Sequence, residues 1–238
     1  LVRIPMMQDS THDIALPVSL ILEYSKSLLG EDYPSKSNVL IDSGYRRMSS
    51  ENFTLFANVG SITPSYQPGH AHADELSFEL FYKGVPTIVD TGVSTYEKND
   101  RRLLERSTSS HNCVVSGSNS SDVWSGFRVG KRANVKIDLD NSQKLMATHD
   151  GFGTLNSRTF DSTVTGQITI TDELVYQKTS KGYYGKGYLH FHPDVHLERI
   201  DEATFLINNQ IYLSFNSDNY NPPIIDLENY SYAKGYNK

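Results

Sequence analysis

The feature that most constrains the fold of this chain is a long series of short apolar or alternating stretches, each followed by turn-forming residues. Stretches of this length and pattern are typical of β-strands, and many of them in succession are typical of a sandwich or a barrel. We therefore predict a mostly β fold, a large antiparallel β-sandwich with a short N-terminal helical segment. The expected strands are 38–41, 53–59, 76–82, 87–90, 112–116, 133–139, 145–149, 157–164, 167–177, 188–192, 204–208 and 210–215.

One helical pattern precedes the strands, over residues 13–30, where apolar residues recur at the spacing of a helix. Pro17 fits the first turn and Gly30 fits the position just past the end. The polar stretch that follows Gly30 is typical of a linker. We therefore divide the chain into a helical segment, residues 1–37, and a β-sandwich domain, residues 38–238.

Composition narrows the classes of partner. The net charge is −6 at pH 7, which argues against nucleic acid because no basic stripe is present to neutralise phosphates. No apolar run reaches the length of about 18 residues that a membrane span needs. The single cysteine, Cys113, excludes an internal disulfide. The chain starts abruptly without a leader-like pattern, and we expect a fragment whose true N-terminus lies elsewhere.

Three histidines and a carboxylate gather in three sequence blocks. GHAHADELSFEL contains His70 and His72, VDTG contains Asp90, and RSTSSHNCVV contains His111. Two histidines and an aspartate can provide three ligands of a tetrahedral zinc site. His-x-His is a weak signal by itself, so histidines with ordinary hydrogen bonds at the surface or core edge are the alternative.

The same blocks resemble the signature of the heparinase II/III-like family of polysaccharide lyases. GHAHADELSFELFYKG, IVDTG and RSTSSHNCVV follow in order, and ATHDGF and LHFHPDV are similar to more distal blocks of the family. The resemblance covers roughly residues 42–215. It implies a helical toroid before the β-sandwich, with the active site in the cleft between them. Residues 13–30 would then be a connector from, or a remnant of, that toroid.

The resemblance also implies roles for individual residues. His70 matches a catalytic histidine, while His72, Asp90 and His111 match a zinc site regarded as structural. The family's catalytic tyrosine, and the asparagine or histidine that neutralises the substrate carboxylate, usually lie on the toroid. We therefore expect this chain alone to have little or no lyase activity. The expected substrate is an acidic polysaccharide such as heparan sulfate or alginate, and the expected location is periplasmic or secreted.

A predicted hairpin around Lys83 and Gly84 limits how His72 and Asp90 can come close enough to bind one metal ion. If Lys83 and Gly84 form a two-residue turn, Asp90 lies opposite Ser77. His72 would then lie about 16 Å from Asp90 along a straight strand, far beyond a zinc–ligand bond. The segment that carries His72 must therefore leave the ladder and turn back.

Other side chains are weaker candidates. Arg106 and Tyr96 are predicted substrate contacts, with surface ion pairs and loop packing as the respective alternatives. Trp124 either stacks on a sugar or anchors the core. Two other functions stay open: a glycan-binding module without catalysis, and a cupin-like metal enzyme, which needs all its ligands on one barrel.

Overall fold

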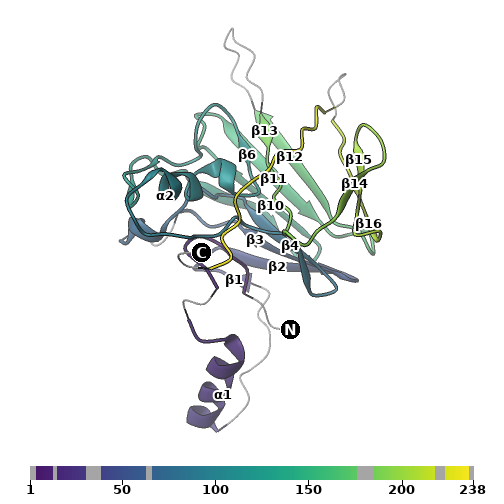
Figure 1. Cartoon of the computed structure of the whole chain (residues 1–238). Helices are drawn as coiled ribbons and strands as arrows, with labels where there is room; N and C mark the ends of the chain where they lie inside the picture. The colour runs from purple at the N-terminus through teal and green to yellow at the C-terminus, as the bar shows by residue number, and fades with distance from the viewer. Residues whose placement is uncertain are drawn as a thin grey trace.

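The computed structural model describes residues 4–12, 15–30, 39–62, 66–175, 185–217 and 223–235. Two larger antiparallel sheets dominate it, with strand orders β1-β2-β3-β4-β5 and β12-β11-β10-β9, and they pack face to face (Figure 1). A smaller sheet, β14-β15-β16, and two short ribbons, β13-β6 and β7-β8, complete the described strands. The predicted mostly β architecture with one short N-terminal helix is confirmed.

The strands are short, as their turn-rich sequence requires. The first sheet contains β1 (Val39–Leu40), β2 (Tyr45–Ser50), β3 (Phe53–Asn58), β4 (Phe78–Tyr82) and β5 (Val85–Ile88). The second contains β9 (Val135–Asp140), β10 (Lys144–His149), β11 (Leu155–Asp161) and β12 (Thr169–Val175). The others are β6 (Val114–Val115), β7 (Val123–Trp124), β8 (Arg128–Val129), β13 (Lys186–Gly187), β14 (Leu197–Arg199), β15 (Thr204–Ile207) and β16 (Ile211–Ser214). The helices are α1 (Val18–Leu29), α2 (Asp100–Glu105) and the 3₁₀ turns η1 (Pro68–His70) and η2 (Thr108–Ser110).

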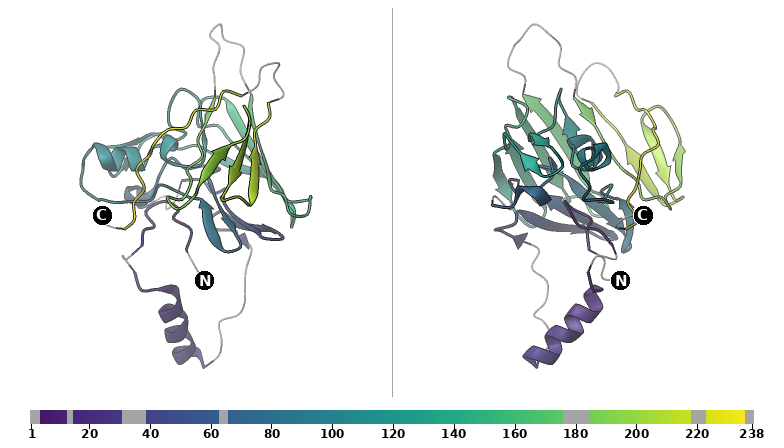
Figure 2. Two further views of the ribbon diagram at one scale, coloured as in Figure 1. Left: turned by 45° about the vertical axis from the view of Figure 1, so that its right-hand side comes forward. Right: turned by 60° about the vertical axis from the view of Figure 1, so that its left-hand side comes forward.

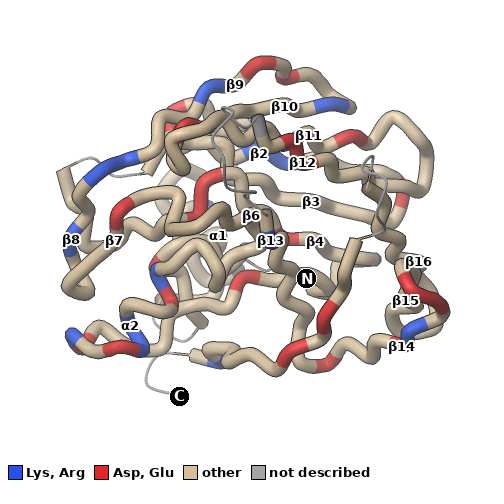
Figure 3. The backbone as a smooth tube through the Cα atoms, turned by 90° about the horizontal axis from the view of Figure 1, so that it is seen from above, with Lys and Arg blue, Asp and Glu red and all other residues tan. Residues whose placement is uncertain are grey.

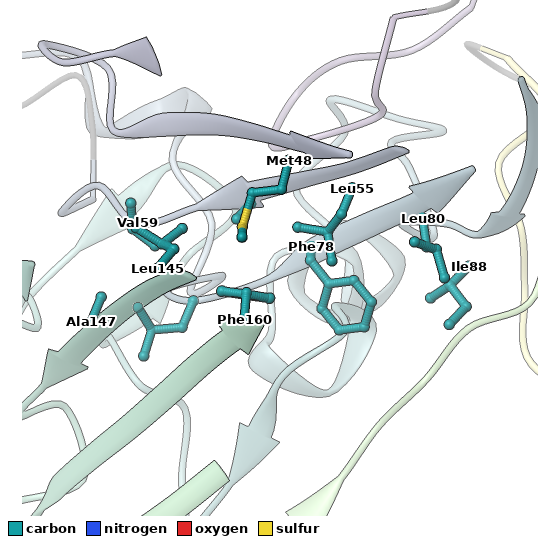
Figure 4. Close-up of a cluster of buried hydrophobic side chains, with 11 residues drawn as sticks. Met48, Leu55, Val59, Phe78, Leu80, Ile88, Leu145, Ala147 and Phe160 are labelled. Carbon is teal, nitrogen blue, oxygen red and sulfur yellow. The ribbon is translucent and has the colours of Figure 1, made fainter. Parts of the chain in front are cut away.

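The main core lies between the two larger sheets. Successive side chains of a strand point to opposite faces, so alternate apolar residues of each strand meet in the middle. Leu55 of β3 and Phe78 of β4 face Phe160 of β11, whose ring lies 5.9 Å from that of Phe78 (Figure 4). Because this cluster joins strands from both sheets, burial of its apolar surface is what holds the sandwich together.

The β4–β5 hairpin forms at the predicted turn. Lys83 and Gly84 have φ values of 50° and 75°, the left-handed pair that a two-residue turn of this type needs, and Tyr82 pairs with Val85. A bulge after Leu80 then shifts the register by one residue. The pairing of Asp90 with Ser77 expected from an unbroken ladder is therefore wrong.

Other strand predictions also differ from the structure, and the strands that were not predicted are β2, β7, β8, β13 and β14. β2 was missed because its sequence, YRRMSS, has two arginines after the first tyrosine and no apolar alternation; Arg46 is buried and pairs with Asp140 of β9 at 2.7 Å. Residues 188–192 form no strand, only an isolated bridge between Phe191 and Ile88. Pro193 follows directly and cannot donate a ladder hydrogen bond.

The helix α1 projects away from the sandwich (Figure 2). Its end is set by Gly30, which has φ 73° and whose N–H donates to the carbonyl of Lys26. None of its residues is buried. Among the described residues no helix combines the length and apolarity needed to cross a bilayer. The linker predicted after Gly30, and with it the proposed boundary near residue 37, lies outside the described residues.

Both terminal segments pack against the sandwich. Met6 and Met7 are buried, and the N–H of Met6 donates to the Glu79 carboxylate at 2.8 Å. From the C-terminal side, Ala233 is buried and donates its N–H to the carbonyl of Thr91. The N-terminal segment thereby reaches the same region as the sequence blocks that contain His70, Asp90 and His111.

Candidate functional site

The segment that carries His70 and His72 leaves the sheet before β4. η1 ends at His70, and the N–H of Ser77 donates to the Asp74 carbonyl in a turn in which Leu76 has φ 63°. The N–H of Ala73 is satisfied outside the sheet, by the carbonyl of Arg106. The fold-back that the metal hypothesis required is thus present.

Asp9, from the N-terminal segment, is the central acceptor of the site. Its Oδ2 lies 2.8 Å from Nδ1 of His70, and its Oδ1 lies 2.7 Å from Nε2 of His72. Arg102 of α2 approaches the same carboxylate with both terminal nitrogens, at 2.5 and 2.8 Å. One carboxylate therefore fixes two histidines and is itself held by a bidentate guanidinium.

The charge state of this cluster follows from burial. Desolvation alone would raise the pKa of Asp9, but hydrogen bonds from His72 and Arg102 outweigh it and hold that pKa far below its ordinary value. Burial lowers the pKa of His72 to about 4, despite the Asp9 carboxylate beside it. At neutral pH His72 is therefore uncharged, and Arg102 is the cation that keeps Asp9 ionised.

A second carboxylate–histidine pair lies beside the first. Oδ2 of Asp90 lies 2.6 Å from Nδ1 of His111, and both side chains are buried. Burial would lower the pKa of His111, but the Asp90 carboxylate reverses the effect and raises it. The rings of His72 and His111 are 5.2 Å apart, so the structure brings all three predicted zinc ligands into one cluster.

The side chains of this cluster are suitable metal ligands, but they do not all point at one common position. Nδ1 of His72 and Nε2 of His111 are buried, and neither has a hydrogen-bond partner among the described residues. In each ring the other nitrogen faces a carboxylate, the pattern of histidines that bind zinc. Asp90 here contacts His111 instead of sharing a point with both rings. No group of three or more His, Cys, Asp or Glu side chains in the described segments has the placement of a metal site.

A further buried acid lies near these rings. Burial raises the pKa of Asp74 to about 7, and the charged neighbours that affect it include His111. Its Oδ2 has no hydrogen-bond partner in the part of the chain that the structure describes. Sequence reasoning missed Asp74 as a site residue, although its position two residues after His72 was a usable signal.

His70 points into open space. Its side chain is 50% exposed and lines a hollow of about 540 Å³ with Gln67, Pro68, Gly69, Tyr96, Phe127 and Arg128. The rings of His70 and Tyr96 meet edge to face at 5.9 Å. Since Asp9 occupies Nδ1, the nitrogen left to face the hollow is Nε2. The structure thus separates His70, at the surface, from His72 and His111, which are buried.

Arg106, a predicted substrate contact, does not reach the surface of the hollow. Its side chain is buried, and its guanidinium donates to the carbonyls of Ala71, Pro68 and Arg128 at 2.8, 3.0 and 3.3 Å. These bonds hold the backbone around the hollow, so we assign Arg106 a supporting role instead of a substrate contact. Arg101, on the same helix α2, forms an ion pair with Glu105 at 2.7 Å.

Comparison with known proteins finds a matching family model and solved structures of similar fold. A family model described as heparinase II/III-like, C-terminal, matches residues 33–238. No curated protein sequence is significantly similar to the chain. Among solved structures, a heparinase III with methylated lysines superposes with a TM-score of 0.58 at 15% identity, covering 85% of this chain and 33% of its own. A mutant of the heparan sulfate lyase HepC from Pedobacter heparinus gives 0.53 at 16% identity, covering 72% and 29%.

At these identities the solved structures support the fold alone. The chain spans about a third of the length of these relatives, so their activities belong to longer molecules. The family match is stronger evidence than these superpositions. It covers most of the sequence and includes every block on which the resemblance rested. The chain therefore belongs to the heparinase II/III-like family, of which it carries the C-terminal domain.

Proposed function

We propose that this chain is the β-sandwich part of a polysaccharide lyase that cleaves glycans containing uronic acid by β-elimination, with His70 as a catalytic acid–base residue. The observation that carries the proposal is the placement of His70. Its ring is half exposed at a hollow, while its inner nitrogen lies 2.8 Å from a buried carboxylate. A general acid–base group needs this combination of access and fixed orientation.

The reaction requires three groups. A base removes the proton next to the uronate carboxylate, a double bond forms as the glycosidic oxygen leaves, and an acid protonates that oxygen. Because the proton is weakly acidic, donors must also neutralise the carboxylate and stabilise the enolate-like intermediate. Histidine can act as base or acid, since its ordinary pKa is near 6.5. His70 supplies one of these roles in the proposal, and a helical domain would supply the others.

The proposal extends to the rest of the molecule. The family match and the length of the relatives support a helical domain that forms the second wall of the cleft, with the chain's substrate an acidic polysaccharide. A periplasmic or secreted location follows from the same reasoning. The alternative, a glycan-binding module without catalysis, does not require a half-exposed histidine in a fixed orientation, so the placement of His70 favours the lyase.

We also propose a structural zinc ion held by His72 and His111, with Asp90 as third ligand or as the partner that orients His111. The two buried nitrogens without partners support it. Such an ion would link the loops that precede β4 and follow η2. Binding and proton uptake would compete at Nε2 of His111, because a ligating imidazole must be neutral.

The catalytic proposal is tested by product formation. The chain and the longest protein that its gene encodes are incubated with heparan sulfate, alginate and related glycans, and the ultraviolet absorbance of the unsaturated uronate is followed. We expect the longer protein to form product and the 238-residue chain to form little or none. No product from any acidic glycan with the longer protein contradicts the proposal.

A variant assigns the role of His70. His70→Gln should reduce the chemical step about 10²–10⁴-fold, the usual contribution of a general acid–base group. Metal content and melting temperature should stay unchanged. His196→Gln is the matched control, because His196 is exposed and lies outside the hollow. A His70→Gln protein that retains full activity, or that loses its metal, contradicts the assignment.

A further inference from the structure

The β7–β8 hairpin presents an outward-facing aromatic and cationic surface at the rim of the hollow. Val123 pairs with Val129, and Trp124 pairs with Arg128. The two valines pack against the small apolar cluster that includes Ala71 and Ala73. Residues paired across an antiparallel ribbon share a face, and successive residues alternate between faces. Trp124 and Arg128 therefore point together away from the core.

Exposure confirms this orientation. Trp124 is 52% exposed and Phe127, at the tip of the hairpin, is 39% exposed. The interpretation of Trp124 as a core anchor is therefore wrong. Arg128 is exposed, and its guanidinium has no ion pair or hydrogen bond with any residue that the structure describes. Trp124 and Phe127 are thus two exposed aromatic side chains on one short hairpin, and an exposed apolar patch can mark a binding surface.

The hairpin is rigidly supported from beneath. Nε of Arg102 donates to the Gly126 carbonyl at 3.2 Å, and Nη2 of Arg106 donates to the Arg128 carbonyl at 3.3 Å. Both of these arginine side chains are fully buried. The Arg102 guanidinium also lies 5.7 Å from the centre of the Phe127 ring. A surface whose backbone is fixed in this way loses little conformational entropy when a ligand binds.

This surface continues the hollow that contains His70. Phe127 and Arg128 line it directly, and Arg102, which holds the tip, is also the partner of Asp9. Figure 3 shows β7, β8 and α2 on one side of the molecule, and two further basic residues, Lys131 and Arg132, follow β8 in the chain after Gly130. The net charge of −6 repels polyanions, so an acidic ligand needs a local cation of this kind.

We propose that Trp124, Phe127 and Arg128 form a subsite for an acidic sugar unit of a glycan. Aromatic rings offer flat faces with large contact area to the apolar side of a pyranose ring. The planar guanidinium of Arg128 matches a carboxylate or a sulfate with two parallel hydrogen bonds. The subsite rests on the proposed function for its place beside His70, and it determines which charged unit lies next to the cleavage point.

The chain offers a direct probe, because Trp124 is its single tryptophan. Titration of the 238-residue chain with a heparan sulfate hexasaccharide should change the intensity and wavelength of Trp124 emission. The same hexasaccharide with its carboxyl groups reduced, its sulfates removed and its free amines acetylated is the neutral control. We expect at least about tenfold weaker binding of the neutral form, the contribution of one charge-assisted hydrogen bond.

Variants separate the contributions of the hairpin. Arg128→Gln should remove the preference for the acidic hexasaccharide, and Phe127→Ala should weaken binding of both forms. Lys83→Gln is the control, since it removes an exposed cation from the β4–β5 turn and should change nothing. Circular dichroism of each variant verifies the fold.

The outcomes distinguish this inference from the lyase proposal. Binding is measured without turnover and is repeated on the His70→Gln variant. Saturable emission changes without product from any form of the protein support the subsite and contradict the lyase proposal. The subsite is contradicted if Arg128→Gln and Phe127→Ala leave the rate of product formation unchanged. The subsite is also wrong if Trp124 does not respond to the acidic hexasaccharide, or if in the longer protein another domain covers Trp124 before sugar is added.

Discussion

Asp9 determines the orientation of three side chains around the hollow, although it lies far from all of them in sequence. It is separated from His70, His72 and Arg102 by 61, 63 and 93 residues. No local pattern relates an aspartate in a polar stretch to partners at such distances. The two histidines were predicted from their motif, whereas the carboxylate that holds them was not, because only the tertiary fold brings it there.

Asp9→Ala tests this central position. The substitution leaves the Arg102 guanidinium buried without its carboxylate, and removing one partner of a buried ion pair costs about 3–5 kcal/mol. We expect the free energy of unfolding in urea to fall by that amount. Asp138→Ala, which removes the exposed contacts with Lys136 and Thr148, should cost much less, because solvent screens exposed pairs. Equal losses for the two variants would refute the central role of Asp9.

At the scale of elements, the β4–β5 hairpin shows that a two-residue turn fixes pairing only nearby. Lys83 and Gly84 gave the correct partners for Tyr82, but the bulge after Leu80 changed the register further along. A bulge depends on how a strand must bend over its core, which a local pattern does not report. Strands with alternating apolar residues were therefore found from sequence, while β2, with its buried Arg46, was missed.

Gly84→Ala measures what that turn contributes. Gly84 has φ 75° with open space around the position of an added Cβ, so the cost is backbone strain without a clash. We expect a loss of about 1 kcal/mol in the free energy of unfolding. Gly187→Ala is the control, because Gly187 also has open space but lies outside the left-handed region. A Gly84→Ala protein as stable as the control contradicts the assigned turn.

His149, at the end of β10, makes the pairing of β10 and β11 sensitive to acid. Burial lowers the pKa of His149 from 6.5 to about 4, so the unfolded chain takes up a proton before the folded chain does. The stability that this group contributes is complete above pH 6.5 and is lost as pH falls toward 4. From 6.5 to about 4 is about 2.5 pKa units, so at about 1.4 kcal/mol per unit the loss is at most roughly 3.5 kcal/mol.

The test compares the parent protein with His149→Gln, which stays neutral. Unfolding in urea is measured between pH 7 and 4, and the parent should lose stability relative to the variant as the pH falls. The comparison is needed because Asp74 and Glu79, whose pKa values burial raises to about 7 and about 8, act in the opposite direction in both proteins. A constant difference across the range would show that His149 does not titrate in this way.

At the scale of the whole molecule, the proposed zinc ion would join segments that the chain places far apart. His72 precedes β4, Asp90 follows β5 and His111 follows η2, so an ion bound by all three would link the two ends of the β4–β5 hairpin to η2. An ion that binds only the folded form adds its binding free energy to stability. The protein purified without added metal should contain close to one equivalent by elemental analysis, and chelation should lower its melting temperature.

Two controls make that result specific. Zinc added after chelation should restore the melting temperature, and His72→Ala should melt at the lower temperature with or without chelator. A protein that contains no divalent metal, and whose melting temperature responds neither to chelator nor to zinc, contradicts the proposed site. The family resemblance predicted which residues gather here, but the choice between Asp90 as ligand and Asp90 as partner of His111 depends on geometry that spacing does not fix.

The position of Asp9 also bears on how this protein is divided for recombinant production. The family match begins at residue 33, and an expression boundary drawn there keeps every strand of the sandwich. It would nevertheless remove Met6 and Met7 from the interior, and Asp9 from Arg102. We expect such a trimmed product to be recovered in low yield or as inclusion bodies, because family boundaries follow sequence similarity and folding units follow buried contacts.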